Sequence, residues 1–412
     1  MMKVLVILPR VPFPMIDGAS KANFQFIKGL SSQGFKVTAI CIAPKKELHH
    51  LNEFKKEAQI DEALFFERQT TDKWKMLKLL WNFIKSPLKP VTYYSFFDKK
   101  LINYLDQKIQ SNKFDEIIAI TPHCAIPLFN RDIAYIYRSE NVEYELWEQS
   151  KNTTNNFLKK IFFSIQQVLV KHYEKKIIQQ AKLTLTISNE DKEKYLKLAP
   201  HSLIEMIPMS FHFSAPLSFP ENELLNLFYL GKLDWQPNLD GLVWFLKEIW
   251  PELNQDIHRK IHLTIAGSGN PTIIQNLIRE IPNNTNITFL GRIASVEDQY
   301  QKCDLVIAPI FYGSGTRIKI LEASLFGRPC LSTQLGFQGS PIVLEGINSG
   351  GLIVQSKEEW LKILENLDRK NLKVLGVNAY QQCKEVLDFD VTAKKVKNLI
   401  LKLHPESNDR HQ

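Results

Sequence analysis

One stretch of the sequence combines a flexible loop with several charged side chains at the start of a predicted helix. It contains, in order, Gly313, Ser314, Gly315, Thr316, Arg317, Lys319 and Glu322. The glycines allow a tight turn and a close approach of the backbone to a ligand, and threonine is a residue type that caps helices. A helix that begins at about Arg317, capped by Thr316, would direct free N–H groups and its positive dipole end at the loop. Such an arrangement suits a phosphate.

Two cations lie in the first turn of this predicted helix. Arg317 and Lys319 oppose the helix dipole there, so an anionic ligand would explain their position. Glu322, one turn further along, could accept hydrogen bonds from sugar hydroxyls. The alternative interpretation is a glycine-rich turn whose charged side chains are simply solvated.

The elements that must position these residues can be read from the apolar pattern. Short β-rich segments alternate with amphipathic segments, and this alternation predicts parallel βαβ units. The predicted strands are Val4–Leu8, Val37–Ile42, Glu116–Ile120, Ala134–Tyr137, Leu183–Ile187, Leu227–Leu230, Ile261–Ala266, Ile287–Leu290, Leu305–Ala308, Cys330–Ser332 and Gly351–Val354. The glycine-rich loop follows Leu305–Ala308, so we expect it at the carboxyl end of a strand.

The alternation is interrupted once, in a proline-bearing segment at residues 208–226. This break predicts a linker between two α/β domains, residues 1–207 and residues 227–388. Residues 389–412 are expected to form a final helix, which could cross back to the first domain, and a frayed tail.

The composition indicates a folded protein and excludes a disordered or collagen-like chain. The 412 residues are 44% apolar and 23% charged, and 52 Lys and Arg against 44 Asp and Glu leave a net charge of +8. This excess fits an anionic substrate, an anionic membrane surface or a nucleic acid. Five widely spaced cysteines argue against a disulfide framework and a structural zinc site, and favour a reducing compartment. The sequence contains no apolar run of about 18 residues, so it predicts no helix that spans a membrane.

Several segments resemble glycosyltransferase family 4, whose members are retaining enzymes of the GT-B fold. The segment from Gly313 to Ala323, G-S-G-T-R-I-K-I-L-E-A, resembles the donor motif of one branch of that family. The segments L-G-K-L-D-W-Q-P-N-L-D-G from Leu230, L-T-I-A-G-S-G-N-P from Leu263 and F-L-G-R from Phe289 resemble other motifs of the second domain. In the first domain, the segment around Gly18 is similar to the loop that closes over the donor.

The resemblance implies an α/β protein with two Rossmann-like domains, whose parallel sheets face across a cleft. A nucleotide sugar would bind mainly to the second domain, and the acceptor would bind to the first. Lys232 and Arg317 would neutralise the donor diphosphate, with Lys319 in reserve, and Glu322 would hold the nucleotide ribose. The family's other donor-site glutamate falls on Ser314, which is a departure from the pattern. No metal or other cofactor is implied.

Candidate residues of the first domain follow two neighbouring predicted strands. His123 follows the strand that ends at Ile120, and the next strand is followed by Glu140, Asn141 and Glu143. Open α/β sheets bind ligands at the carboxyl ends of their strands. His123 could contact the transferred sugar or the acceptor, and the other three are acceptor-side candidates. The alternative for His123 is a structural role. The family branch usually has histidine where Glu140 stands.

Three further features have competing interpretations. The basic segments 73–89 and 156–182 mix lysines with apolar residues, and predict either solvated surface helices or docking to anionic lipid. Asp388 and Asp390 match a metal-binding D-x-D pattern, but Asp390 fits the N-cap of the last helix better. Trp235 and Trp244 are expected to be core aromatics.

The residues and the resemblance together predict a hexosyltransferase-type enzyme, class EC 2.4. It would move a sugar, with retention of configuration, from a nucleotide-diphosphate sugar to a glycan or lipid-linked acceptor in bacterial cell-surface polysaccharide synthesis. We expect a cytoplasmic protein that associates peripherally with the plasma membrane and binds no nucleic acid. The alternatives are a sugar-nucleotide epimerase or hydrolase of the same fold, and a catalytically inert sugar-nucleotide-binding module.

Overall fold

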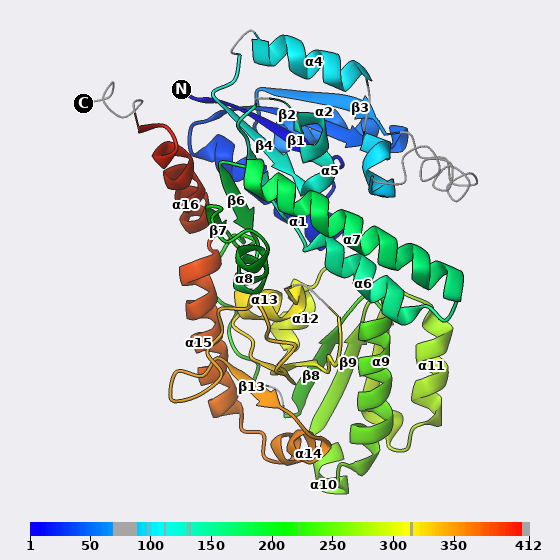
Figure 1. Ribbon diagram of the computed structural model, residues 1–412. Coiled ribbons are helices and arrows are strands. Elements are labelled where there is room, and N and C mark those ends of the chain that lie inside the picture. Colours follow the sequence, from blue (N-terminus) through cyan, green and yellow to red (C-terminus); the bar gives the residue numbers. More distant parts are fainter. Residues whose placement is uncertain are drawn as a thin grey trace. The chain divides into compact units, whose positions relative to one another are not determined.

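The chain forms two compact units, each built around a parallel sheet (Figure 1). The computed structural model describes residues 1–68, 89–96, 99–110, 113–129, 131, 133–221, 223–313 and 316–405. The first unit comprises Met1–Ser210 together with Phe389–Gln412, and the second comprises Phe211–Asp388. Of the basic segment 73–89, all residues but Lys89 lie outside the described ranges.

The first unit contains a seven-stranded sheet in the order β3-β2-β1-β4-β5-β6-β7, and each neighbouring pair is parallel. Its strands are β1 (Lys3–Leu8), β2 (Lys36–Ala43), β3 (Glu62–Glu67), β4 (Glu116–Ile120), β5 (Ile136–Arg138), β6 (Leu183–Thr186) and β7 (Ile204–Met206). The strand order reverses between β1 and β4, which creates a topological switch point. In this sheet, β3 and β7 were not predicted from the sequence.

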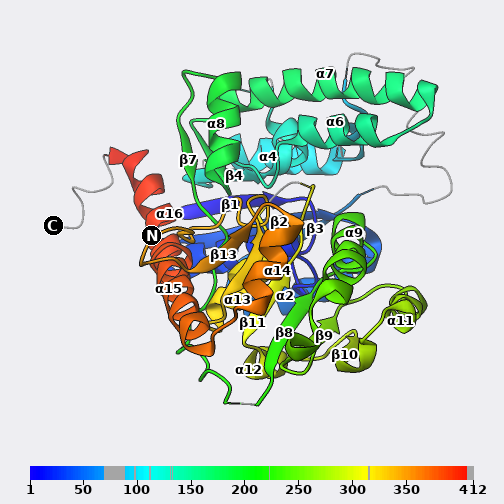
Figure 2. The ribbon, with the colours of Figure 1, turned by 90° about the horizontal axis from the view of Figure 1, so that it is seen from below.

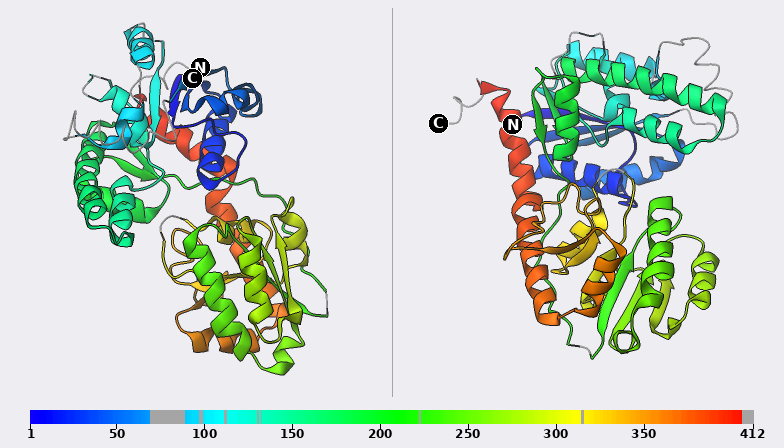
Figure 3. Two further views of the ribbon diagram at one scale, coloured as in Figure 1. Left: turned by 90° about the vertical axis from the view of Figure 1, so that its right-hand side faces the viewer. Right: turned by 60° about the horizontal axis from the view of Figure 1, so that its bottom comes forward.

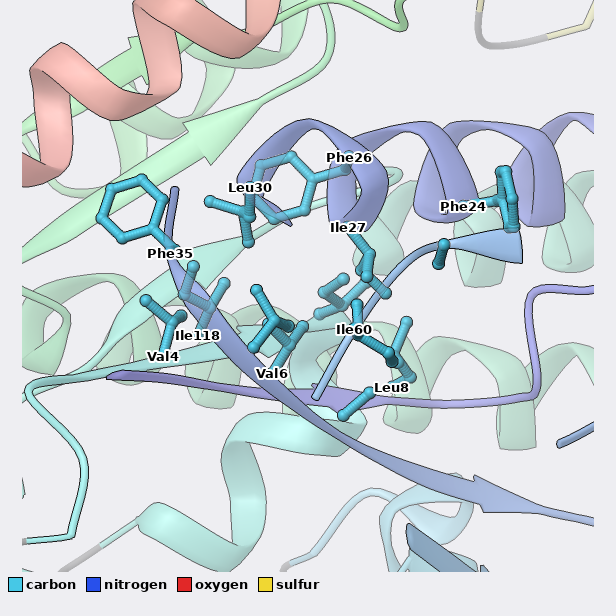
Figure 4. Packing of buried hydrophobic residues seen from close by; sticks show 14 of the residues in the cluster. Val4, Val6, Leu8, Phe24, Phe26, Ile27, Leu30, Phe35, Ile60 and Ile118 are labelled. Atoms are coloured by element: carbon cyan, nitrogen blue, oxygen red, sulfur yellow. The ribbon is translucent and has the colours of Figure 1, made fainter. Parts of the chain in front are cut away.

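Helices and short 3-10 segments cover both faces of this sheet. They are α1 (Gly18–Ser32), η1 (Lys45–His50), α2 (Leu51–Glu57), η2 (Val91–Phe96), α4 (Lys99–Gln110), α5 (Thr121–Ala125), η3 (Ile126–Leu128), α6 (Glu143–Thr153), α7 (Phe157–Gln180), α8 (Asn189–Leu198) and α16 (Phe389–Lys402). Figure 4 shows Ile27 and Leu30 of α1 pointing toward Val4 and Val6 of β1. This packing buries one face of the sheet.

The last helix of the chain completes the core of the first unit. Val396 and Ile400 of α16 are buried in the same cluster as the α1 side chains. A Cβ at Gly29 of α1 would lie 3.3 Å from Ala393 Cβ of α16, so the two helices are in close contact (Figure 3). The helix begins at Phe389, which puts Asp390 in its first turn rather than at the predicted N-cap. A carboxylate there still complements the helix dipole.

The second unit contains a six-stranded parallel sheet in the order β10-β9-β8-β11-β12-β13 (Figure 2). Its strands are β8 (Leu225–Leu230), β9 (Ile261–Ala266), β10 (Ile287–Gly291), β11 (Leu305–Ala308), β12 (Cys330–Thr333) and β13 (Gly351–Val354). Every strand of this sheet overlaps a predicted segment. The strand order reverses between β8 and β11, so these neighbours form the switch point of this sheet.

The helices of the second unit pack around a core with large aromatic side chains. They are α9 (Gln236–Trp244), η4 (Phe245–Ile249), η5 (Trp250–Glu252), α10 (Gln255–His258), α11 (Pro271–Glu280), η6 (Asn284–Asn286), α12 (Glu297–Lys302), α13 (Ile318–Leu325), α14 (Lys357–Glu365) and α15 (Arg369–Leu387). Trp250 and Trp360 are fully buried in this core. None of the helices in the described part of the chain combines the length and apolar character needed to cross a bilayer.

Candidate functional site

The switch point of the second sheet brings together the loop that carries Lys232 and the glycine-rich loop that leads to Arg317. The strands β8 and β11 are hydrogen-bonded neighbours, and both end at the same edge because they run parallel. Gly231 and Lys232 follow β8, and the loop that leads to Arg317 follows β11. In open α/β sheets, this position is where ligands bind.

The loop after β8 is fixed by close backbone contact with the loop after β9. The Gly231 N–H donates to the Ala266 carbonyl at 3.1 Å, and the Leu233 N–H donates to the Ser268 carbonyl at 2.6 Å. Gly267 has a φ of +155°, and a Cβ built there would lie 1.7 Å from the Gly231 carbonyl oxygen. Only glycine fits at position 267, because any side chain would push these two loops apart.

The Lys319 ammonium is held in the site by specific contacts. Its Nζ donates to Asn238 Oδ1 at 2.8 Å and lies 4.8 Å from the centroid of the Tyr229 ring. A Cβ at Gly231 would lie 3.1 Å from this Nζ, so the ammonium reaches the loop after β8. Burial, and then the neighbouring Arg317 guanidinium, lower the Lys319 pKa to about 7. An anion beside this ammonium would restore its charge.

Asn238, at the start of α9, connects the two lysines of the site. Its Nδ2 donates to the Lys232 carbonyl at 3.0 Å, while its Oδ1 accepts from Lys319. Its own carbonyl accepts a hydrogen bond from the Tyr229 hydroxyl at 2.7 Å. The Lys232 side chain itself is exposed, with Nζ 3.8 Å from Asp234 Oδ2. One asparagine therefore links the Lys232 backbone to the half-buried Lys319 ammonium.

Arg317 occupies the N-cap position of α13, which begins one residue later than predicted. The predicted cap, Thr316, lies outside the helix, and no side chain caps this end. The Arg317 side chain is buried, and its Nη2 donates to the Gly313 carbonyl at 2.9 Å. Burial lowers the Arg317 pKa. The guanidinium thus closes the loop on itself, although Ser314 and Gly315 lie outside the described residues.

Trp235 lines the same loop and was missed by the sequence prediction. It was expected in the core, yet its side chain is 41% exposed. Gly313 has a φ of +114°, and a Cβ there would lie 3.3 Å from the Trp235 ring. The tryptophan is exposed because it follows the loop after β8 and precedes α9, where it packs over the backbone of the glycine loop.

The residues just before Gly313 are anchored to α9. The Tyr312 hydroxyl donates to Asp240 Oδ2, and Gln236 Nε2 donates to the other oxygen of that carboxylate at 2.6 Å. Phe311 and Trp244 pack with their ring centroids 4.7 Å apart. Glu322 lies half-buried on α13 and adds to the effect of burial in raising the Tyr300 pKa. Side chains of α9 therefore hold the residues just before Gly313.

The first unit places its candidate residues at the carboxyl ends of β1, β4 and β5. Gly18 is the first residue of α1, directly after the N-cap Asp17. Asp17 Oδ1 accepts from the Ser20 N–H at 2.8 Å, and Arg10 pairs with the same carboxylate at 2.8 Å. His123 lies in α5, which directly follows β4.

The surroundings of His123 keep its imidazole neutral. Its ring centroid lies 5.0 Å from that of Tyr93 and 4.9 Å from that of Phe96. Burial, together with the Arg68 guanidinium, lowers the His123 pKa to about 4. At neutral pH this side chain carries no charge, and it can donate a hydrogen bond from one ring nitrogen and accept one at the other.

Glu140 belongs to a buried polar chain that links β5 to α1. Arg138 Nη1 donates to Asn23 Oδ1 at 2.9 Å, and Asn23 Nδ2 donates to Glu140 Oε1. Burial lowers the Arg138 pKa to about 10 and raises that of Glu140. Asn23 and Arg138 were missed, because no motif marks them and they meet only in the folded chain.

A second buried carboxylate holds the start of α6. Glu174 of α7 accepts from the Glu143 N–H at 3.1 Å and the Tyr144 N–H at 3.3 Å, and also from the Tyr195 hydroxyl. Asn141 contributes its carbonyl, which accepts from Tyr195 at 3.2 Å. Burial, followed by neighbouring carboxylates, raises the Glu143 pKa to about 8, and burial raises that of Glu174 to about 7.

The described residues therefore form two separate groups of candidate side chains. In the second unit Lys232, Arg317 and Lys319 gather around loops that end two neighbouring strands, and in the first unit His123 and Glu140 follow two others. Within the ranges that the structure describes, no three His, Cys, Asp or Glu side chains converge as ligands for a metal ion. The second group has the positive charge that a phosphate requires.

Known proteins share both sequence and structural similarity with this chain. Residues 225–368 match the family described as Glycosyl transferases group 1, a segment that spans the loops from Gly231 to Glu322. Sucrose-phosphate synthase from Thermosynechococcus elongatus has a similar structure, with a TM-score of 0.67 and 14% identity over 98% of this chain and 100% of that one. The fold is GT-B. The predicted pair of Rossmann-like domains with parallel sheets is therefore confirmed.

Two further proteins are similar to this chain over nearly its full length. HepE from Anabaena, solved in complex with UDP-glucose, has a TM-score of 0.66 and 14% identity, covering 98% of this chain and 100% of that one. A protein of Klebsiella pneumoniae named "Uncharacterized 44.6 kDa protein in cps region" is 24% identical over 417 residues, covering 98% of this chain and 100% of that protein. The family match and the GT-B structures together support membership of this chain in the GT-B glycosyltransferase superfamily.

Proposed function

We propose that the protein is a retaining glycosyltransferase of family 4. It transfers a hexose from a nucleotide-diphosphate sugar to a glycan or lipid-linked acceptor. The second unit, through Lys232, Arg317 and Lys319, binds the donor diphosphate. The observation that carries this proposal is the half-buried Lys319 side chain beside Arg317, with its ammonium on Asn238, at the carboxyl ends of β8 and β11.

The energetic argument starts from two cations that repel each other in the free protein. Burial of Lys319 next to Arg317 lowers its pKa to about 7, so the free site is electrostatically unfavourable. A diphosphate removes that repulsion and takes charge-assisted hydrogen bonds from both groups. The same cations stabilise the negative charge that develops on the diphosphate as the glycosidic bond breaks. The glycine loop and the N-terminus of α13 add backbone donors.

The remaining roles are proposed from the resemblance to family 4 and from the position of these residues after strands. Glu322 binds the nucleotide ribose, and His123 and Glu140 contact the transferred sugar or the acceptor from the first unit. The acceptor hydroxyl attacks on the face that the diphosphate leaves, and a phosphate oxygen takes its proton. This route needs no protein nucleophile and preserves the configuration at the anomeric carbon.

The comparisons support the donor class and the process. HepE binds UDP-glucose, so a nucleotide sugar is a donor class that this fold accommodates. The relative from Klebsiella pneumoniae is named for its position in a cps region, which supports a role in cell-surface polysaccharide synthesis. Because Lys232, Arg317 and Lys319 supply positive charge, we propose that the reaction needs no divalent metal.

The test is sugar transfer from a panel of sugar-labelled nucleotide sugars to lipid and polysaccharide fractions, with Arg317→Ala as the control variant. The expected result is acceptor-dependent transfer that this variant loses, with retention of the anomeric configuration by NMR. Free sugar released at the same rate without acceptor would instead indicate a hydrolase. Donor binding without any turnover would indicate an inert binding module.

A further inference from the structure

The outward face of α7 carries a continuous set of large apolar side chains. Phe157, Leu158 and Val168 are 73%, 75% and 67% exposed, and Ile161 and Ile165 are also exposed. With 3.6 residues per turn, these five positions fall within about 100° of the helix circumference. We call this set, Phe157, Leu158, Ile161, Ile165 and Val168, the α7 stripe.

The α7 stripe is not part of the core of the first unit, because α7 packs into that core with its opposite face. Val170 and Ile177 are buried, Ile177 in a cluster with strand residues of the sheet, and the buried Gln166 accepts a hydrogen bond from the Val91 N–H at 3.0 Å. Between α6 and α7, which lie side by side (Figure 2), the ring centroid of Trp147 is 6.2 Å from Phe162 and 5.9 Å from Phe163. The stripe residues therefore contribute apolar surface to solvent and little to the core.

Along α7 itself, the charged residues that border the stripe have a single sign. Exposed lysines at positions 160, 171, 175 and 176 lie on the borders of the stripe or continue it toward the C-terminus. The one acidic residue of α7, Glu174, is buried and accepts hydrogen bonds from the start of α6. The solvent-facing surface of this helix is thus apolar and cationic, with no carboxylate to balance the lysines.

We propose that the α7 stripe docks the protein on an anionic lipid bilayer. Over residues 157–168 the stripe is about 17 Å long and one helix wide. That shape suits shallow insertion of an apolar helix face among lipid headgroups, with the lysines on phosphate. It is small for a stable protein interface, which needs about 800 Å² from each partner. A second copy of the chain would also bring lysines against lysines.

This proposal is independent of the donor site. Glu174, which lies on the same helix, holds the start of α6, where Glu143 lies, so membrane docking would bring this acceptor-side candidate close to the lipid surface. That proximity fits a lipid-linked acceptor among the acceptor classes proposed above. The α7 stripe belongs to the first unit, whereas Lys232, Arg317 and Lys319 belong to the second.

The test is flotation of the full chain with vesicles of phosphatidylcholine alone or of equal parts phosphatidylcholine and phosphatidylglycerol. The wild type should float with the anionic vesicles at low salt and much less with neutral vesicles or at raised salt. The variant L158S/V168S should bind about tenfold more weakly or worse, since it removes two exposed apolar anchors. The variant K175A/K176A should bind more weakly and lose part of its salt dependence.

The matched control is V374S/V377S, which removes two exposed valines from α15 of the second unit. It should float like the wild type. Absence of flotation with anionic vesicles, or equal flotation of L158S/V168S, would overturn the proposal. A concentration-dependent dimer in sedimentation velocity that L158S/V168S abolishes would overturn it in favour of a second copy. Calorimetry with UDP separates the proposals, because loss of flotation with normal UDP binding leaves the donor site unaffected.

Discussion

The Lys319 ammonium donates to Asn238 Oδ1 at 2.8 Å, and Asn238 donates in turn to the carbonyl of Lys232. A side chain on α9 therefore sets the position of a cation on α13 relative to the loop after β8. Asn238 is a neutral partner, so it fixes the ammonium without neutralising it. The charge of Lys319 remains available for a ligand.

This relationship predicts that donor affinity depends on pH. Lys319 has a pKa of about 7 in the free protein, so its ammonium is charged below that pH and loses its proton above it. A bound diphosphate raises this pKa, and UDP binding should therefore take up protons and weaken as pH rises from about 6 to about 8, by up to roughly tenfold. Calorimetry with UDP in buffers of different ionisation enthalpy measures both effects. The variant Lys319→Met should bind weakly and show no pH dependence, and a wild-type affinity that is constant over this range would contradict the assignment.

Arg317→Ala and Lys232→Ala should each reduce sugar transfer severely. Loss of one charge-assisted hydrogen bond to phosphate costs about 1.5–3 kcal/mol, which corresponds to roughly 10–100-fold in rate. Steady-state kinetics measures the loss. Arg279→Ala is the control, because this exposed arginine lies on α11 and outside the loops of the site. Near-normal rates in both site variants would show that these cations do not contact the leaving group.

The fold could be predicted from the sequence wherever strands form distinct apolar runs. The six strands of the second sheet overlap predicted segments because each is a short apolar run bounded by turn residues. The two missed strands, β3 and β7, are the edges of the first sheet. β3 is only half-buried and is flanked by glutamates, and β7 has three residues, so neither produces a clear apolar pattern.

The candidate site was predictable where its residues belong to a recognisable contiguous motif or directly follow a predicted strand. The glycine loop and its two cations form one contiguous motif, whereas Asn238 is separated by 81 residues from Lys319. Likewise Asn23 and Glu140 are 117 residues apart and meet through packing of α1 against the sheet. The exposure of Trp235 was wrongly predicted because large aromatic side chains are usually buried.

Gly241→Ala should destabilise the second unit even though alanine favours helices. A Cβ at this position of α9 would lie 1.8 Å from the Pro309 carbonyl oxygen, so α9 must move away from the loop that follows β11. We expect a loss of about 1–3 kcal/mol in unfolding free energy, typical of overpacking, and weaker UDP binding. Urea denaturation measures the first effect. Gly29→Ala is the comparison, since the atom nearest to its Cβ would be the Ala393 Cβ, at 3.3 Å, and it should be tolerated much better.

Divalent metal should be dispensable for sugar transfer. A diphosphate must be neutralised by a bound cation or by fixed positive groups, and Lys232, Arg317, Lys319 and the N-terminus of α13 supply the latter. Protein treated with EDTA should keep most of its activity, and added magnesium or manganese should change it little. Complete loss with EDTA that either metal restores would show that the leaving group depends on a metal ion.

Glu174→Gln should change how the stability of the protein depends on pH. In the folded protein the Glu174 pKa is raised from 4.5 to about 7, chiefly by burial, so the folded state binds this proton more tightly than the unfolded state. Stability from this group is therefore fully present below about pH 4.5 and is lost as pH rises through about 7. The difference in unfolding free energy between about pH 5 and about pH 8 should shrink in the variant by about 1–3 kcal/mol.

Urea unfolding at these two pH values measures this change, and Glu193→Gln on α8, an exposed position, is the control. The control should keep the wild-type dependence, because an exposed carboxyl titrates similarly in both states. Acceptor-dependent transfer should also fall in Glu174→Gln while UDP binding stays normal, because an amide has a single acceptor oxygen for the N–H groups of Glu143 and Tyr144. An unchanged pH dependence of stability would show that Glu174 is ionised in the folded protein, and normal transfer would show that the start of α6 does not bind the acceptor.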